Sequence, residues 1–275
     1  MKITPTPIIV AICLAATCIP LVFTIETKDL ELAECAVEPK LETVVNYLVS
    51  NSTLEYRTKE EMAQKLEQTI TRSNWILSNS CIPMSRKLGD ITYLEMSSHN
   101  MDQMIQLIND IERKLGPQYI ENIRSKPNHY YGLVLTYKDG FYDSGFIGAT
   151  DVELDPQFFT IHHDADEYTV EHELGHLAWA WHDDTSYNDA LTDRLHEGTK
   201  PVNQSKINSY ARGATCGDAG TVMAYSFKRI PIYSSPAIFY QGEACGDAKT
   251  ADNARQLREY ARNMRDMISV ESPQG

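Results

Sequence analysis

Three histidines and a glutamate lie close together in the stretch EHELGHLAWAWHDD, residues 171 to 184. His172 and His176 are four positions apart, which on a helix places both imidazoles on one face, one turn apart. This spacing suits two ligands of a tetrahedral zinc ion. Glu173 follows the first histidine, and a carboxylate there could take a proton from water and pass it to a leaving amine. The pattern predicts a hydrolytic zinc site.

The third ligand determines the kind of zinc site. His182 lies six residues past His176, and on a continuous helix it would point away from the first two histidines. It can reach the same ion only if the helix ends near residue 178 and the chain turns back. An alternative is the glutamate that completes thermolysin-like sites about twenty residues farther on. Glu197 lies at that distance, but no helix is predicted around it, so we favour His182.

Read from His172 to Asp183, the order HExxHxxxxxHD resembles the signature of the metzincin zinc peptidases. In that family a glycine usually occupies the turn before the third histidine, and Trp179 stands in its place here. A bulky residue at positive φ costs about 1–2 kcal/mol. Zinc binding is worth several times as much and could offset that cost. We expect Asp183 to cap the turn or to orient a ligand rather than to bind the metal.

A second part of the resemblance lies downstream, in GTVMAYS, residues 220–226. Metzincins carry a methionine beneath the metal in a tight turn, and the Met-x-Tyr order of Met223 and Tyr225 matches the astacin-like and serralysin-like members. The flanking Tyr-Ser-Ser-Pro and Ala-Asp-Asn-Ala-Arg sequences are similar to those of secreted bacterial reprolysin-like metzincins. The resemblance implies a Met-turn at Met223 and an oxyanion-stabilising hydrogen bond from Tyr225. A tyrosine that only packs against the turn is the alternative.

The resemblance covers roughly residues 59 to 268 and implies the fold. We expect an α/β (α+β) metzincin-like catalytic domain, with a twisted mixed sheet and two long helices above an irregular C-terminal subdomain that ends in a helix. The catalytic domain would span 59–275, its upper part reaching about 183 and its lower part running from 184 to 275. In the family an edge strand pairs with the extended substrate. Here that edge would include Gly145, Phe146, Ile147 and Gly148.

Periodicity and turn residues predict the individual elements. Helices are expected around 41–49, over 59–77, over 100–116, through the histidine motif and over 250–268. Strands are expected at 90–96, 130–137 and 157–163, with an extended, glycine-punctuated edge at 140–154. The pair His162-His163 ends one of these strands, and we expect it to be structural or at the surface.

The N-terminus and the cysteines favour export. Lys2 precedes a long apolar run, Ile8 to Phe23, so we expect residues 1–25 to be a signal peptide or an N-terminal anchor, followed by an extension over 26–58. Four cysteines follow that segment and allow three connectivities. We favour Cys216–Cys245, which closes one C-terminal loop, and Cys35–Cys81 by elimination, with buried free thiols as the alternative. The protein is predicted to be secreted or periplasmic.

Composition limits the partners. A net charge of −13 disfavours nucleic acid, and membrane contact is expected only through the N-terminal segment, if that is uncleaved or lipidated. The expected partner is a protein or peptide substrate, and the expected cofactor is one catalytic Zn²⁺. Ca²⁺ is possible in the acidic stretch 184–206, but its acids do not follow a calcium-loop spacing.

These observations predict a zinc-dependent endopeptidase with Glu173 as general base. The rival interpretation is a zinc-binding surface or adhesion protein whose site is degenerate and not catalytic. The presence of Glu173 disfavours that rival, because a purely structural site does not need the acid.

Overall fold

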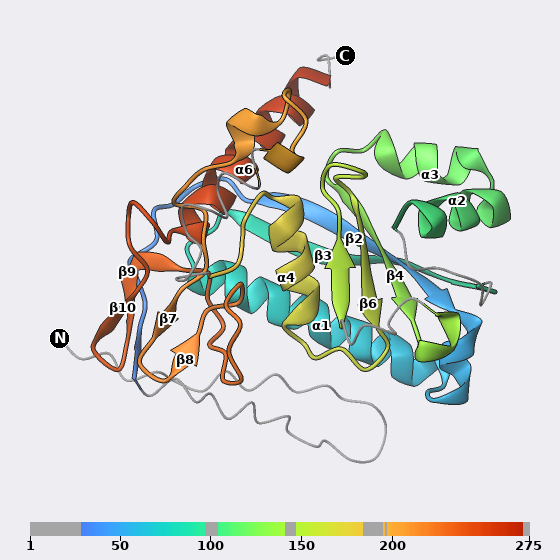
Figure 1. Ribbon diagram of the computed structural model, residues 1–275, viewed down its shortest axis with the longest axis horizontal. Helices are drawn as coiled ribbons and strands as arrows, with labels where there is room; N and C mark the ends of the chain where they lie inside the picture. Colours follow the sequence, from blue (N-terminus) through green and yellow to red (C-terminus); the bar gives the residue numbers. More distant parts are fainter. Residues whose placement is uncertain (1–28, 97–103, 141–146, 184–194, 196, 272–275) are drawn as a thin grey trace.

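A five-stranded mixed sheet organises the computed structural model, which describes residues 29–96, 104–140, 147–183, 195 and 197–271 (Figure 1). The strand order is β3-β2-β4-β6-β5, in which the first four strands are parallel and β5 is an antiparallel edge. The strands are β2 (Leu41–Ser50), β3 (Met84–Leu94), β4 (His129–Leu135), β5 (Gly148–Thr150) and β6 (Phe158–His162). This is the α+β architecture that the sequence predicted.

Helices cover both faces of the sheet. On one face, α1 (Lys59–Asn79) and α4 (Thr169–Leu177) share a hydrophobic core with the sheet, and α6 (Asn253–Glu271) adds Ala254, Leu257 and Ala261 to it. On the other face, α2 (Met104–Leu115) and α3 (Pro117–Arg124) enclose a second core. The central parallel strands are therefore buried on both sides.

The segment 41–49, expected to be helical, is instead strand β2, hydrogen-bonded between β3 and β4. The helix prediction was wrong because Val45, Tyr47, Leu48 and Val49 are all fully buried, so the strand shows no polar alternation. Its β-branched residues suit a central strand. Residues 41–50 thus lie at the centre of the sheet, within the same folded unit as residues 59–271.

Most of the other expected elements are confirmed. The helices over 59–77 and 250–268 are α1 and α6, and the strands at 130–137 and 157–163 are β4 and β6. The strand expected at 90–96 begins earlier, at Met84. The helix expected over 100–116 is α2, and its first positions lie outside the described residues, as do 1–25, Gly145 and Phe146. No helix in the described ranges is long and apolar enough to cross a membrane.

The C-terminal part contains short strands and two disulfides. β7 (Thr215–Cys216) pairs with β8 (Ala219–Gly220). A separate sheet has the order β1-β9-β10, with β1 (Leu30–Glu31), β9 (Ser235–Tyr240) and β10 (Glu243–Cys245). Cys216–Cys245 joins β7 to β10, and Cys35–Cys81 fastens the segment after β1 to the end of α1. Both favoured pairings are therefore confirmed.

A buried ion pair connects the sheet to α4 and to the C-terminal part. Arg86 of β3 donates to both carboxylate oxygens of Glu171 on α4, Nε to Oε2 at 3.1 Å and Nη2 to Oε1 at 3.0 Å. The two side chains are 1% and 0% exposed. The Tyr233 hydroxyl donates to Glu171 Oε1 at 2.9 Å, and Arg86 Nη1 donates to Thr43 Oγ1 at 3.1 Å. Glu171 directly precedes the first histidine, so this ion pair fixes the position of α4, and of that histidine, relative to the sheet.

We predict that Arg86→Met lowers the free energy of unfolding by about 3–5 kcal/mol, because it leaves the Glu171 charge buried without its cation. Urea unfolding followed by circular dichroism measures the change. The matched control is Arg255→Met, which removes an exposed i,i+4 partner of Glu259 and should cost no more than about 1 kcal/mol. Equal losses in the two variants would contradict the prediction.

Candidate metal centre

Helix α4 carries the first two histidines and ends directly after them. The Trp179 N–H donates to the His176 carbonyl at 2.9 Å, and the Ala180 N–H donates to the Gly175 carbonyl at 3.0 Å. These two bonds form a Schellman motif, in which the residue past the cap adopts the left-handed conformation. That residue is Trp179, with φ of 65°. The helix therefore ends where the spacing of the histidines required it to end.

Trp179 compensates for its strained backbone with packing. Its side chain is only 4% exposed, and its ring lies edge-on to the Trp181 ring at 6.2 Å. The Lys206 ammonium lies 5.3 Å from the centre of the Trp179 ring. The left-handed conformation costs about 1–2 kcal/mol. Burial of a large aromatic ring stabilises the fold by more than that.

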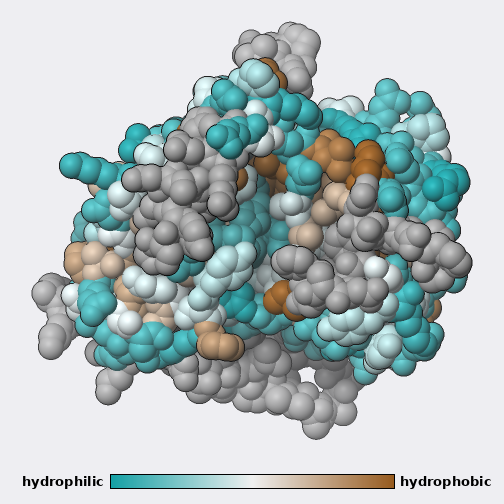
Figure 2. Space-filling view, in the orientation of Figure 1, coloured by the Kyte–Doolittle hydropathy of each residue, from teal (hydrophilic) through white to brown (hydrophobic). Residues whose placement is uncertain are grey.

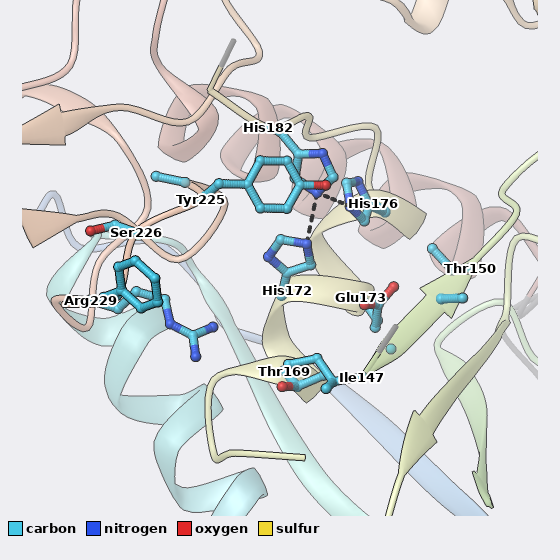
Figure 3. A pocket seen from close by; sticks show the side chains of 14 residues that line it. Ile147, Thr150, Thr169, His172, Glu173, His176, His182, Tyr225, Ser226 and Arg229 are labelled. Carbon is cyan, nitrogen blue, oxygen red and sulfur yellow. Dashed lines mark hydrogen bonds between the residues drawn. The ribbon is translucent and has the colours of Figure 1, made fainter. Parts of the chain in front are cut away.

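The three histidines converge after this turn. His182 Nε2 lies 2.9 Å from Nε2 of His172 and 2.9 Å from Nε2 of His176 (Figure 3). The Nδ1 atoms of His172 and His176 lie 2.9 Å from the carbonyl oxygens of Val222 and Ala180. A carbonyl oxygen only accepts hydrogen bonds, so both Nδ1 atoms carry the hydrogen and both Nε2 atoms present lone pairs.

This donor set fits a metal ion such as zinc. The lone pairs of His172 and His176 point toward His182 Nε2, and a cation bound among the three nitrogens could be held by all of them. Burial lowers the pKa of His172 and of His176. Burial, together with the nearby His172 and Arg212 side chains, lowers the pKa of His182 to about 3. The histidines are thus neutral near pH 7, which is the form that binds a metal.

Glu173 and the edge strand form one wall of a cleft over α4. Glu173 is 4% exposed, and burial raises its pKa to about 8. A pocket of about 680 Å³ opens in front of the histidines, visible as a hollow between the sheet and the C-terminal part (Figure 2). The residues of the edge, at 147–150, and those that follow Met223, at 224–227 and 229, lie on its two sides. Its remaining lining residues are Thr169, His172, Glu173, His176 and His182.

Gly148 of the edge strand leaves room for the carboxylate. A Cβ atom at this position would lie 2.4 Å from Glu173 Oε1 and 2.8 Å from Thr169 Cγ2. Any side chain at residue 148 would displace the Glu173 carboxylate. The edge strand thus determines where the candidate general base lies, whatever it contributes to substrate binding.

The expected Met-turn lies directly behind the histidines. Met223 is fully buried, and a Cβ atom at Gly175 of α4 would lie 2.7 Å from its sulfur. Asp183 Oδ1 accepts a hydrogen bond from the Tyr225 N–H at 2.8 Å, which ties the turn to the segment carrying the third histidine. Tyr225 is 73% exposed, and its ring centre lies 4.2 Å from that of His182 at a tilt of 44°, with its hydroxyl end toward the histidines (Figure 3).

Two other candidates from the sequence, Glu197 and the His162-His163 pair, are not part of the histidine site. Glu197 is exposed and belongs to neither cluster of metal-ligating side chains in the described part of the chain. The second of those clusters is His162, His163 and Asp164. The Arg57 guanidinium lies there, 2.7 Å from the Asp164 carboxylate and 3.4 Å from His163 Nδ1. An arginine charge thus stands where a metal would have to bind, which favours a structural role.

Sequence reasoning missed one charged group in the cleft. Arg229 lines the pocket together with Thr169 of α4 and Phe227 of the loop after the Met-turn. No spacing rule indicates Arg229, because it belongs to an irregular segment. Its position six residues after Met223 was the only available signal.

Comparisons with known proteins are consistent with a metal-dependent hydrolase, over part of the chain. No family model matches. A segment of 95 residues, 33% of this chain, is 37% identical to a curated protein of Xanthomonas campestris pv. campestris named peptidyl-Asp metalloendopeptidase. That match covers 19% of the relative, so the chain spans about a fifth of its length.

Among solved structures, one described as a chaperone–substrate complex matches 83% of this chain and 35% of its own chain, with a TM-score of 0.59 and 12% identity. That likeness concerns the fold alone. Metalloproteinase-II from Bacteroides fragilis matches 83% of this chain and 56% of its own, at 15% identity, but its TM-score of 0.42 is too low to support an argument.

We predict that Gly148→Ala lowers the rate of peptide hydrolysis at least ~10-fold by moving the Glu173 carboxylate, since small displacements of a catalytic group are costly. The bound metal and the melting temperature should change little, because the displaced atom ends a flexible side chain. Gly198→Ala is the control, as its added Cβ would meet no atom within 4 Å. Normal activity in Gly148→Ala would show that the carboxylate position is unimportant.

We also predict that Trp179→Gly lowers the free energy of unfolding by about 2–3 kcal/mol, since loss of the ring outweighs relief of the strained φ. Trp179→Ala is the matched comparison, because it loses the ring but keeps the strain. It should be about 1 kcal/mol less stable than Trp179→Gly. Chemical denaturation measures both variants, and a glycine variant more stable than the wild type would refute the account of the turn.

Proposed function

We propose that the chain is an exported zinc-dependent endopeptidase of the metzincin type. The observation that carries the proposal is the convergence of three histidine Nε2 atoms beside a buried carboxylate, within one open cleft. A metal-binding protein without catalysis needs the histidines but has no use for a buried, ionisable glutamate beside them. The partial relative, itself named a metalloendopeptidase, supports the same class.

The histidines would hold the ion, and the surrounding carbonyls would orient them. His172 and His176 donate from Nδ1 to backbone oxygens, which keeps each ring turned toward the common point. Zinc, when bound there, supplies Lewis-acid polarisation of the scissile carbonyl and lowers the pKa of water. Met223 packs under α4, and the Schellman turn directs the chain from His176 back toward His182.

Glu173 would move the proton. Its carboxylate takes a proton from the attacking water and later gives it to the leaving amine. Burial raises its pKa to about 8, so the protonated form that the second step needs is accessible near neutral pH. The positive charge of a bound metal lowers that pKa again, which favours the base form before attack.

Two further groups would contribute to the reaction. The Tyr225 hydroxyl would donate a hydrogen bond to the developing oxyanion, from a ring already in contact with His182. The exposed edge at 147–150 would add a strand of extended substrate backbone, which is a common way to bind peptides. The substrate is therefore a protein or peptide in extended form.

The disulfides support the proposed location. Two disulfides in one chain are typical of oxidising compartments such as the periplasm or the extracellular space. The apolar N-terminal run would direct export, and it lies outside the described residues. The possible Ca²⁺ site in the acidic stretch 184–206 remains without support, since most of that stretch also lies outside the described residues.

We predict that Glu173→Gln lowers the rate of cleavage of an unfolded protein at least ~100-fold while one zinc ion stays bound, because only proton transfer is lost. Gel analysis and mass spectrometry of the fragments follow cleavage, and atomic absorption counts the zinc in both proteins.

The control is Glu259→Gln, which removes an exposed carboxylate of α6 that does not line the pocket. Loss of zinc in Glu173→Gln would mean that Glu173 is needed for the site itself. If wild type and variant both hold zinc and neither cuts any protein, the site is a binding site, and the rival interpretation replaces this one.

A further inference from the structure

His182 differs from the other two candidate ligands in how the fold holds it. His172 and His176 stand on α4, where the helix fixes their separation. His182 comes after the helix has ended, so its place depends on what holds the backbone of residues 178–181. Helix α6 begins beside this turn, next to the end of α4 (Figure 1). The contacts between α6 and the turn therefore bear directly on the third ligand.

Two side chains of α6 donate hydrogen bonds to carbonyls of this turn. Gln256 Nε2 donates to the Ala178 carbonyl at 3.1 Å. Asn253 Nδ2 donates to the Trp181 carbonyl at 3.1 Å. Both side chains are buried, and a buried amide that loses its acceptor costs free energy, so the fold favours keeping both bonds. One of the two acceptors directly precedes His182 in the chain.

Asn253 also connects the turn to a neighbouring irregular segment. The Trp181 N–H and carbonyl each form a 2.9 Å hydrogen bond with the backbone of residues 211–213. The Ser234 hydroxyl donates to the Arg212 carbonyl in the middle of that segment. The same hydroxyl accepts a hydrogen bond from the Asn253 N–H at 2.9 Å. The side chain of Asn253 thus holds the turn, and its backbone holds the segment on which the turn rests.

The turn is held from the ligand side as well. His176 Nδ1 donates to the Ala180 carbonyl at 2.9 Å. The carbonyls of Ala178, Ala180 and Trp181 therefore accept side-chain hydrogen bonds from two helices, α4 and α6. A backbone fixed at three carbonyls in succession leaves the residue that follows little freedom to move.

We propose that Asn253 is a positioning residue for the candidate metal ligand His182, and that Gln256 assists it. Asn253 does not line the pocket, so it acts through the Trp181 carbonyl, one peptide bond away from the histidine. The inference rests on the proposed metal centre and adds to it a helix that lies about seventy residues past the histidine motif. Groups that orient a metal ligand by hydrogen bonding are typically worth about 10–100-fold in metal affinity.

The residue type suits this role. An amide nitrogen donates to a carbonyl without carrying a charge, so it can do so from a fully buried position. A carboxylate of the same shape only accepts, and it would face the Trp181 carbonyl with like partial charge. Asn253→Asp should therefore disturb the turn at least as much as removal of the side chain does.

The test measures zinc affinity instead of catalysis. Asn253→Ala removes the donor, while the Trp181 carbonyl keeps its hydrogen bond from the Gly213 N–H, so the variant should fold. We expect its dissociation constant for zinc, measured by competition with a chromophoric chelator, to rise at least ~10-fold. The visible absorption of the Co²⁺-substituted variant should also weaken, because its intensity depends on tetrahedral coordination.

The matched control is Asn46→Ala. Asn46 is a buried asparagine of β2 whose Nδ2 donates to the Tyr130 carbonyl at 3.1 Å, and it does not line the pocket. Its Oδ1 also accepts from the Asp90 N–H, so this variant should lose at least as much stability as Asn253→Ala. Its zinc affinity and Co²⁺ spectrum should stay at the wild-type values. Equal weakening of zinc binding in both variants would show a general loss of stability and overturn the proposal.

Gln256→Ala provides a second variant if Asn253→Ala does not fold. It should weaken zinc binding by a smaller factor, since its acceptor, Ala178, is farther along the chain from His182. If both α6 variants bind zinc as tightly as the wild type, the positioning role is refuted and the peptidase proposal stands. A wild type that binds zinc but cuts no protein refutes the peptidase proposal and leaves the zinc comparison valid.

Discussion

The geometry of the centre depends on the reversal of the chain directly after His176. Three imidazole nitrogens can meet at one point only if α4 stops within two residues of its second histidine. The Schellman turn at Trp179 satisfies that constraint, and the surrounding contacts follow from it. His182 returns to the helix, and Asp183 then reaches the backbone of the Met-turn. The residue type at the turn matters less than the hydrogen bonds that close it, since buried packing replaces the freedom of glycine.

The buried pair of Arg86 and Glu171 supplies the second constraint. A helix held against a sheet by apolar contacts alone can shift by a fraction of a residue, because dispersion contacts are not directional. A bidentate ion pair is directional, and the Tyr233 hydroxyl adds a third bond from the C-terminal part. Both walls of the cleft are thus positioned by one carboxylate, which lies one residue before the first candidate metal ligand.

The sequence predicted the features that rest on spacing and missed those that rest on tertiary environment. The end of α4, the positive φ at Trp179 and the cysteine pairs followed from residue types and their separations. Strand β2 did not, because a strand buried on both faces has the apolar pattern of a helix. Arg229 was missed because no local pattern places an irregular segment against a helix; the catalytic roles remain proposals.

The short strand β1 has a consequence for how the molecule forms. Leu30 pairs with Tyr240, so residues near the start of the described chain complete a sheet whose other strands are made near its end. During synthesis this edge stays without its partner until most of the polypeptide has emerged. Folding that depends on such distant contacts is slow, and the last step closes the molecule as a whole.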